Sequence, residues 1–333
     1  MTRRDFLGSA AAASVQTNRR SGLGLSPDCF VIARPPRTAL EYLEKARSAG
    51  AAGVQSTLAS NDPAYLKSVR EYLDRHGMYL EIATRLPGDD TTEFETTVRS
   101  AREAGATCIR SVCLSGRRYE NFNTLDEWTA FVTDSKARLA RAVKIVDRLR
   151  FPLGLENHKD WTIAEMVPLL KSYSSEFLGA CIDFGNNMSL LEPAEELVEA
   201  LAPFAVNTHI KDMAVEEYED GFLLAEVALG RGVVDLPRCV DAVRKARPKA
   251  RFSLDMLTRD PLKIPCLTPK YWATFPSRGG RDLAAALTFV RRHKPAQPLP
   301  KVSSMDRETQ LRAELENVTA SVAYARDSLG ILA

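Results

Sequence analysis

The sequence predicts a (β/α)8 TIM barrel with a helix appended after it. From Ser21 onward, short β-rich runs alternate with amphipathic helical runs, which is typical of βαβ units on a parallel sheet. Eight runs of each kind fit within about 270 residues, as a closed barrel requires, whereas an open doubly wound sheet usually has fewer strands. Glycines at 50, 77 and 105 follow predicted helices, where a left-handed residue commonly ends the helix.

The elements follow one another in regular order. The predicted strands cover residues 22–25, 53–58, 79–84, 108–114, 153–157, 180–184, 206–211 and 251–256. The predicted helices cover residues 38–49, 64–75, 91–104, 125–149, 162–173, 193–202, 237–246 and 281–292. Apolar residues recur at helical spacing in each, for example Leu66, Val69 and Leu73.

Residues 21–293 are therefore predicted to form the barrel, and residues 294–333 a proline-rich linker and a C-terminal helix. Residues 1–20 form an N-terminal tail that contains Arg3 and Arg4 before a weakly apolar stretch, as a twin-arginine export signal does. They fit a plain basic tail equally well. We expect a periplasmic location if the signal is functional and a cytoplasmic one otherwise.

Composition excludes several classes of protein. Forty-five Lys and Arg against 43 Asp and Glu leave a net charge of +2, too balanced for a nucleic-acid binder steered by bulk charge. No segment resembles a membrane span. The six cysteines contain no CxxC pair, which argues against a zinc finger or a disulfide framework. We expect neither a nucleic-acid nor a membrane partner, and we leave a homo-oligomer open.

One potential metal ligand stands at the end of each of the last four predicted strands. These residues are Glu156, Asp183, His209 and Asp255. Functional groups of a barrel lie at the carboxyl ends of its strands, so the four side chains should converge. Three converging carboxylates would repel one another unless a cation neutralised them. Oxygen ligands with one imidazole suit Mn²⁺, Mg²⁺ or Co²⁺, with Zn²⁺ also allowed.

Several motifs resemble one known family. They are LENHKD at 155–160, CIDFGN at 181–186, THIKD at 208–212, LGRGVVDLP at 229–237 and LDMLTRDP at 254–261. In order and spacing they are similar to the sugar phosphate isomerase/epimerase proteins of the xylose isomerase-like barrel superfamily. The resemblance covers about residues 23–290 and implies that Glu156, Asp183, His209 and Asp255 hold the metal. The family usually has glutamate at the last position, one methylene longer than Asp255.

The resemblance implies a divalent-metal-dependent sugar isomerase or epimerase, with a small carbohydrate as substrate. Such an enzyme removes a proton next to the metal-bound carbonyl of a ketose or keto sugar, because the metal makes that C–H more acidic. Glu156 is the predicted base and Asp255 its partner acid.

Five further residues are predicted to bind substrate. Strand alternation places His158 on the side of Glu156, and Lys211 on the side of His209. Lys211 could equally bind an oxyanion or pair with Asp212. The full set is His158, Asn186, Lys211, Arg110 and Arg259.

Three alternative functions can be compared with this sequence. The superfamily's DNA-repair endonucleases need many histidines for three zinc ions, and this chain has four, of which only His158 and His209 are near strand ends. A keto-glycoside lyase or hydrolase could use the same enolisation. A non-catalytic sugar-binding barrel is supported only by Asp255. The long 257–276 segment, with Tyr271 and Trp272, could cover a bulky sugar or pack the barrel mouth.

Overall fold

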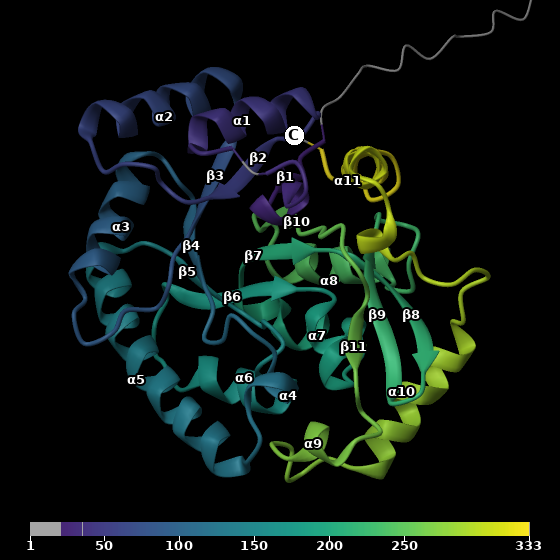
Figure 1. Ribbon diagram of the computed structural model, residues 1–333. Helices are drawn as coiled ribbons and strands as arrows, with labels where there is room; N and C mark the ends of the chain where they lie inside the picture. The colour runs from purple at the N-terminus through teal and green to yellow at the C-terminus, as the bar shows by residue number, and fades with distance from the viewer. Residues whose placement is uncertain (1–20, 35, 333) are drawn as a thin grey trace, which may run out of the picture.

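Eight parallel strands close into a barrel in the computed structural model, which describes residues 21–34 and 36–332 (Figure 1). The barrel strands are β1 (Gly24–Leu25), β2 (Gly53–Ser56), β3 (Tyr79–Ala83), β4 (Cys108–Ser111), β5 (Leu153–Glu156), β6 (Leu178–Asp183), β7 (Ala205–Ile210) and β10 (Arg251–Leu254). Each pairs with the barrel strand next to it in sequence, and β10 closes onto β1. The predicted (β/α)8 barrel is confirmed.

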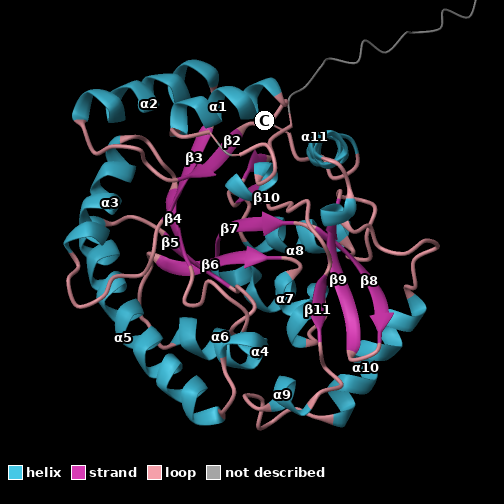
Figure 2. Ribbon diagram, viewed as in Figure 1, coloured by secondary structure: helices cyan, strands magenta, loops and turns pink. Residues whose placement is uncertain are grey.

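Helices cover the outside of the barrel (Figure 2). They are α1 (Ala39–Ser48), α2 (Pro63–His76), α3 (Thr92–Glu103), α5 (Leu125–Leu149), α6 (Ile163–Lys171), α7 (Ala194–Leu201), α8 (Leu236–Ala246) and α10 (Gly280–Arg292), with the short α4 (Arg118–Asn121) before α5. The glycines at 50, 77 and 105 have φ of 81°, 60° and 84°, as predicted for left-handed helix ends. None of the helices in the described ranges is long and apolar enough to cross a bilayer. Residues 1–20, with their predicted signal or tail, lie outside the described residues.

A final helix, α11 (Arg307–Asp327), follows the proline-rich linker and packs against the 3₁₀ turn η1 (Pro27–Phe30) after the first strand. Ser21 forms an antiparallel bridge with Leu332, and the Gly22 N–H donates to the Ile331 carbonyl at 2.7 Å. The buried Glu314 of α11 accepts the N–H groups of Ile32 (2.6 Å) and Ala33 (2.9 Å). The appended helix therefore fixes the loop after β1.

We expect Glu314→Ala to lower the free energy of unfolding by about 2 kcal/mol, because it leaves a buried backbone donor without a partner. Urea unfolding followed by circular dichroism would measure the change. Glu316→Ala on the same helix is the control, since its side chain is 67% exposed in a long ion pair with Arg312. Equal stability of the two variants would contradict the assigned role of Glu314.

A second sheet, which the sequence analysis missed, lies at the carboxyl end of the barrel. Its antiparallel strands are β8 (Asp212–Tyr218), β9 (Gly221–Val227) and β11 (Leu262–Ile264), and α10 packs against it. The 257–276 segment contains β11 and the short α9 (Pro269–Trp272). Tyr271 and Phe275 are buried and stack on each other, so these aromatic rings pack the structure instead of forming an open sugar platform.

Candidate active site

The four side chains predicted as metal ligands converge at the carboxyl end of the barrel. His209 Nδ1 lies 3.4 Å from Glu156 Oε2, 3.9 Å from Asp183 Oδ2 and 3.8 Å from Asp255 Oδ2. All four side chains are buried. The sequence therefore predicted correctly that these residues lie together, while their binding of a metal stays a prediction.

Strand register sets the relative positions of these residues. Asp183 at the end of β6 is paired with His209 of β7, and Glu156 of β5 is paired with Cys181 of β6. Asp183 Oδ1 accepts the N–H groups of Gly185 (2.9 Å) and Asn186 (2.7 Å), where the 3₁₀ turn η2 (Asn186–Leu190) begins. This leaves Oδ2 of Asp183 directed toward the other three groups.

A buried polar chain beneath the site fixes the ring of His209. Glu81 Oε2 accepts the Gln55 amide N–H at 3.2 Å, which turns Gln55 Oε1 toward His209 Nε2 at 3.0 Å. His209 therefore carries a proton on Nε2 and directs Nδ1 toward the carboxylates. Within the described part of the chain, Nδ1 is buried and has no hydrogen-bond partner.

The surroundings of Nδ1 favour a positive charge there. Burial alone would lower the pKa of His209, but Cys181 and the carboxylates of Glu156 and Asp255 raise it well above its ordinary value. A proton or a metal ion can supply that charge.

Two basic side chains already neutralise part of the carboxylate charge. Arg110 of β4 pairs with Glu156, and Lys211 Nζ lies 2.8 Å from Asp183 Oδ2 and 2.5 Å from Asp255 Oδ2. Burial would raise the pKa of Asp255, but Lys211 and His209 hold it well below the ordinary value. For Asp183 burial dominates and its pKa is raised.

Lys211 does not pair with Asp212, one of the two alternatives that the sequence left open. The carboxylate of Asp212 instead accepts the backbone N–H groups of Gly230 (3.0 Å), Gly232 (2.8 Å) and Val234 (3.1 Å). Asp212 thus holds the loop after β9, and Lys211 is directed into the site. Residues 230–232 form a turn, and the N–H groups of Gly230 and Gly232 already donate to the Asp212 carboxylate.

A cavity of about 420 Å³ opens beside these residues. Four of the five predicted substrate-binding residues line it: Arg110, His158, Lys211 and Arg259. The fifth, Asn186, is buried and does not line the cavity. Its side-chain amide donates to Glu156 Oε1 at 3.2 Å and to the Asn157 carbonyl at 3.1 Å. The structure thus places Asn186 where it orients Glu156.

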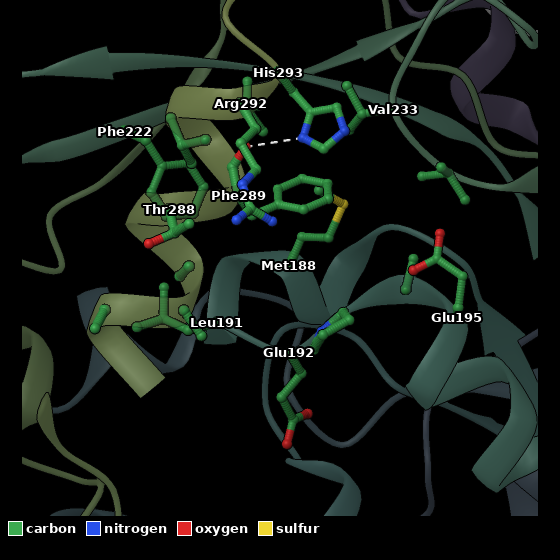
Figure 3. A pocket seen from close by; sticks show the side chains of 18 residues that line it. Met188, Leu191, Glu192, Glu195, Phe222, Val233, Thr288, Phe289, Arg292 and His293 are labelled. Atoms are coloured by element: carbon green, nitrogen blue, oxygen red, sulfur yellow. Dashed lines mark hydrogen bonds between the residues drawn. The ribbon is translucent and has the colours of Figure 1, made fainter. Parts of the chain in front are cut away.

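A separate apolar cavity of about 520 Å³ lies between α10, η2 and the second sheet (Figure 3). In Figure 3 the side chains of Met188 and Phe289 face the same hollow, beside His293. None of the four converging residues lines it. The polar cavity at the carboxyl end of the barrel is therefore the candidate active site.

Comparison with known proteins agrees with this fold. The family model of xylose isomerase-like TIM barrels matches residues 43–274. The chain belongs to this family. Its helices and strands, and the resemblance in its motifs, are those expected of a member.

Among curated proteins, a 3-oxo-isoapionate decarboxylase from Pectobacterium atrosepticum is 28% identical over 209 residues, 61% of this chain and 71% of the relative. Among solved structures, an L-ribulose 3-epimerase has a TM-score of 0.53 at 15% identity, over 91% of this chain and 95% of that chain. A xylose isomerase-like barrel protein from Mycobacterium smegmatis in complex with magnesium has a TM-score of 0.55 at 14% identity, over 90% of this chain and 98% of that chain. At these identities the solved structures establish the fold alone.

The residues present fit a divalent cation. One donor atom each from Asp183, His209 and Asp255 lie within 4.8 Å of one another, and the unpartnered Nδ1 supplies a nitrogen ligand among oxygens. Cys181 stands equally close to Glu156 and His209, but burial raises the pKa of its thiol to about 11. The thiol therefore stays protonated at neutral pH and is a poor ligand.

Sequence reasoning missed several residues of this site. Ser26 Oγ donates to Asp255 Oδ1 at 2.8 Å, and Asp28 lines the cavity. Both follow the first strand, in the position where the other barrel strands carry polar groups, and this signal could have found them. Lys159 lies inside the LENHKD motif and also lines the cavity. Glu226 of β9 pairs with the cavity residue Arg259 at 2.7 Å. It comes from the second sheet, so the pattern of barrel strands gave no reason to select it.

His158 is predicted to stay neutral at pH 5. Burial lowers its pKa to about 3, and its Nδ1 donates to the Leu114 carbonyl at 2.9 Å. An unfolded chain takes up that proton near pH 6.5, so the contribution of His158 to stability is lost as pH falls from about 6.5 toward 3. Between pH 7 and 5, the wild type should lose about 1–2 kcal/mol relative to His158→Gln. Urea unfolding at both pH values measures this, and a protonated ring at pH 5 in ¹H–¹⁵N NMR spectra would contradict it.

Proposed function

We propose that this chain is a divalent-metal-dependent sugar isomerase or epimerase that removes a proton next to the carbonyl of a ketose or keto sugar. The observation that carries the proposal is His209 Nδ1, which is buried, has no hydrogen-bond partner among the described residues and faces three carboxylates beside a polar cavity. Glu156, Asp183, His209 and Asp255 would hold the ion, with Mn²⁺, Mg²⁺ or Co²⁺ as the best chemical match and Zn²⁺ allowed.

The bound ion would withdraw electron density from a substrate carbonyl and so make the neighbouring C–H more acidic. Glu156 is the proposed base. Burial would raise its pKa, but Arg110 and His209 lower it well below the ordinary value, so Glu156 is ionised at neutral pH. Asn186 and Arg110 hold its two oxygens in place.

Asp255 and Asp28 are the proposed source of the returning proton. Burial and the neighbouring Asp255 raise the pKa of Asp28 to about 7, so Asp28 carries a proton in about half of the molecules at neutral pH, while Asp255 is ionised. Asp28 lines the cavity, and Asp255 is anchored by Ser26 and Lys211. The remaining cavity residues, His158, Lys211 and Arg259, would contact substrate oxygens.

A second candidate is decarboxylation of a keto acid, favoured by the 28% identical relative named 3-oxo-isoapionate decarboxylase. Here the C–C bond to the carboxylate breaks, its electron pair moves toward the carbonyl to give an enolate, CO2 leaves, and a proton is returned to carbon. This reaction needs no base for a C–H bond. A carboxylate that is paired with a cation is a weaker base. The reaction therefore suits a site in which Arg110 pairs with Glu156, and Lys211 pairs with Asp183 and Asp255.

Metal analysis combined with two turnover assays tests the proposal. We expect about one divalent ion per chain in the wild type and loss of that ion in His209→Ala, because one of four ligands disappears. NMR in D2O would follow carbon-bound deuterium in a ketose panel, and CO2 release would be measured on a panel of β-keto sugar acids. Deuterium incorporation supports the isomerase, and CO2 release alone supports the decarboxylase.

His293→Ala is the matched control, since this imidazole lies on α10 away from the site. It should keep both the metal and the turnover. A wild-type protein that binds no divalent ion under any loading condition would rule out the proposed chemistry and leave the sugar-binding barrel.

A further inference from the structure

Five basic side chains line the cavity beside the proposed metal site: Arg110, Arg117, Lys159, Lys211 and Arg259. Only two carboxylates, Asp28 and Asp255, line it with them. Four of the five cations have an acidic partner. Arg110 pairs with Glu156, Lys211 with Asp183 and Asp255, Arg259 with Glu226 at 2.7 Å, and Arg117 with Glu120 at 2.7 Å.

Lys159 is the exception. Its side chain is buried, with 5% of the residue exposed, and Nζ donates to the neutral amide oxygen of Asn186. Within residues 21–34 and 36–332, Lys159 forms no ion pair. A buried ammonium without a carboxylate is costly, so it is expected where a ligand supplies the negative charge.

The backbone also holds Lys159 in an unfavourable conformation. Its φ of 61° is in the left-handed region, which non-glycine residues rarely adopt. The turn is fixed from both sides, because Asp160 Oδ1 accepts the N–H groups of His158 (3.0 Å) and Trp161 (2.8 Å). The Lys159 carbonyl accepts the Arg118 N–H at 3.0 Å. Strain maintained in this way is common at ligand-binding positions.

Asn186 links Lys159 to the proposed base. Its amide oxygen accepts from Lys159 Nζ, and its amide nitrogen donates to Glu156 Oε1 at 3.2 Å. A negative group bound by Lys159 would therefore lie one side chain away from Glu156. A divalent ion would add two further positive charges to a buried network in which the other cations are already paired.

We propose that Lys159 binds a carboxylate of the substrate, so that the cavity selects a keto sugar acid over a neutral ketose. This inference rests on the proposed function in that the ligand is taken to be its substrate. A carboxylate fits better than a phosphate, since phosphate sites usually use several free backbone N–H groups. The N–H groups of Gly230 and Gly232 are already bonded to Asp212.

Binding of two unreactive probes, D-gluconate and D-sorbitol, tests this proposal by isothermal titration calorimetry on the metal-loaded protein at pH 7. The two differ chiefly in the carboxylate. We expect gluconate to bind at least about tenfold more tightly in the wild type, as one charge-assisted hydrogen bond predicts. Lys159→Met should remove this preference and leave sorbitol binding unchanged. Lys159→Arg should retain it within about threefold.

Lys171→Met is the matched control, because Lys171 is an exposed lysine at the end of α6. It should bind both probes as the wild type does. In the wild type, gluconate affinity should fall as pH rises above about 8, because burial and Lys211 lower the pKa of Lys159 to about 8. If Lys159→Met does not fold, the pH dependence of gluconate affinity in the wild type tests the proposal instead.

Equal binding of gluconate and sorbitol by the wild type would overturn the inference, and so would a preference that survives in Lys159→Met. Inorganic phosphate binding more tightly than gluconate, and lost in Lys159→Met, would overturn the choice of carboxylate. Metal content separates the two proposals. A gluconate preference in a protein that binds no metal would contradict the proposed function alone. Bound metal with deuterium incorporation into a ketose, but without a gluconate preference, would contradict this inference alone.

Discussion

Glu156→Gln is expected to lower kcat by about 10²–10⁴-fold, the range found when a positioned general base is removed. Glutamine keeps the shape of the side chain but cannot accept the proton. It also leaves Arg110 without its acidic partner. The measurement is the rate of carbon-bound deuterium incorporation into whichever ketose or keto acid the wild type turns over, with metal content determined on the same sample.

Two further variants make this result specific. Glu156→Asp keeps the charge and should recover part of the rate. Glu199→Gln, which breaks an exposed ion pair between Glu199 of α7 and Arg238 of α8, should have no effect. Metal-loaded Glu156→Gln protein that retains the wild-type rate would show that another group removes the proton.

Lys211→Met is expected to lower the free energy of unfolding of the metal-free protein by about 3–5 kcal/mol, the usual cost of removing one partner from a buried ion pair. Lys211 is 1% exposed and lies within 2.8 Å of both Asp183 and Asp255. Without its ammonium group, these two buried carboxylates retain only His209 as a nearby partner that can carry a positive charge. Urea unfolding in the presence of EDTA measures the loss.

Divalent metal should then stabilise Lys211→Met more than it stabilises the wild type. The ammonium and the metal ion neutralise the same two carboxylates, so removing the ammonium removes the competitor. Repeating the urea unfolding with saturating Mn²⁺ tests this. Lys67→Met is the control, because it removes an exposed lysine from an ion pair with Glu71. Equal metal stabilisation of the wild type and Lys211→Met would mean that the ion binds elsewhere.

The barrel could be predicted from sequence because short β-rich runs alternate with amphipathic helical runs along residues 21–293. The predicted helix over 125–149 coincides with α5, whose capping box of Thr124 and Glu127 marks its start. The hairpin of β8 and β9 was missed, since it adds two strands beyond the expected alternation. A signal was present in the polar pair Glu219-Asp220 followed by Gly221, which forms the two-residue turn between the paired Tyr218 and Gly221.

The centre of the candidate site was easier to predict than its rim. Glu156 and Asp183 each end a barrel strand, His209 is next to last in its strand, and parallel strands bring their carboxyl ends together. The role of Lys159 depends on which cation finds a partner and which does not. That is decided by side-chain packing across loops and the second sheet, and strand patterning carries no information about it.

The contact between the segment before β1 and the residues after α11 has a consequence for the order of folding. Gly22 is bonded to Ile331, and Ser21 pairs with Leu332, more than 300 positions later in the chain. A growing chain that has not yet reached residues 307–332 therefore lacks the contacts that hold the segment before β1, and closing so long a loop is slow. We expect ribosome-bound chains that stop at residue 300 to be cut by protease near residues 21–34, and chains that expose residue 332 to resist. Protection of the shorter chains would show that the barrel closes without its last helix.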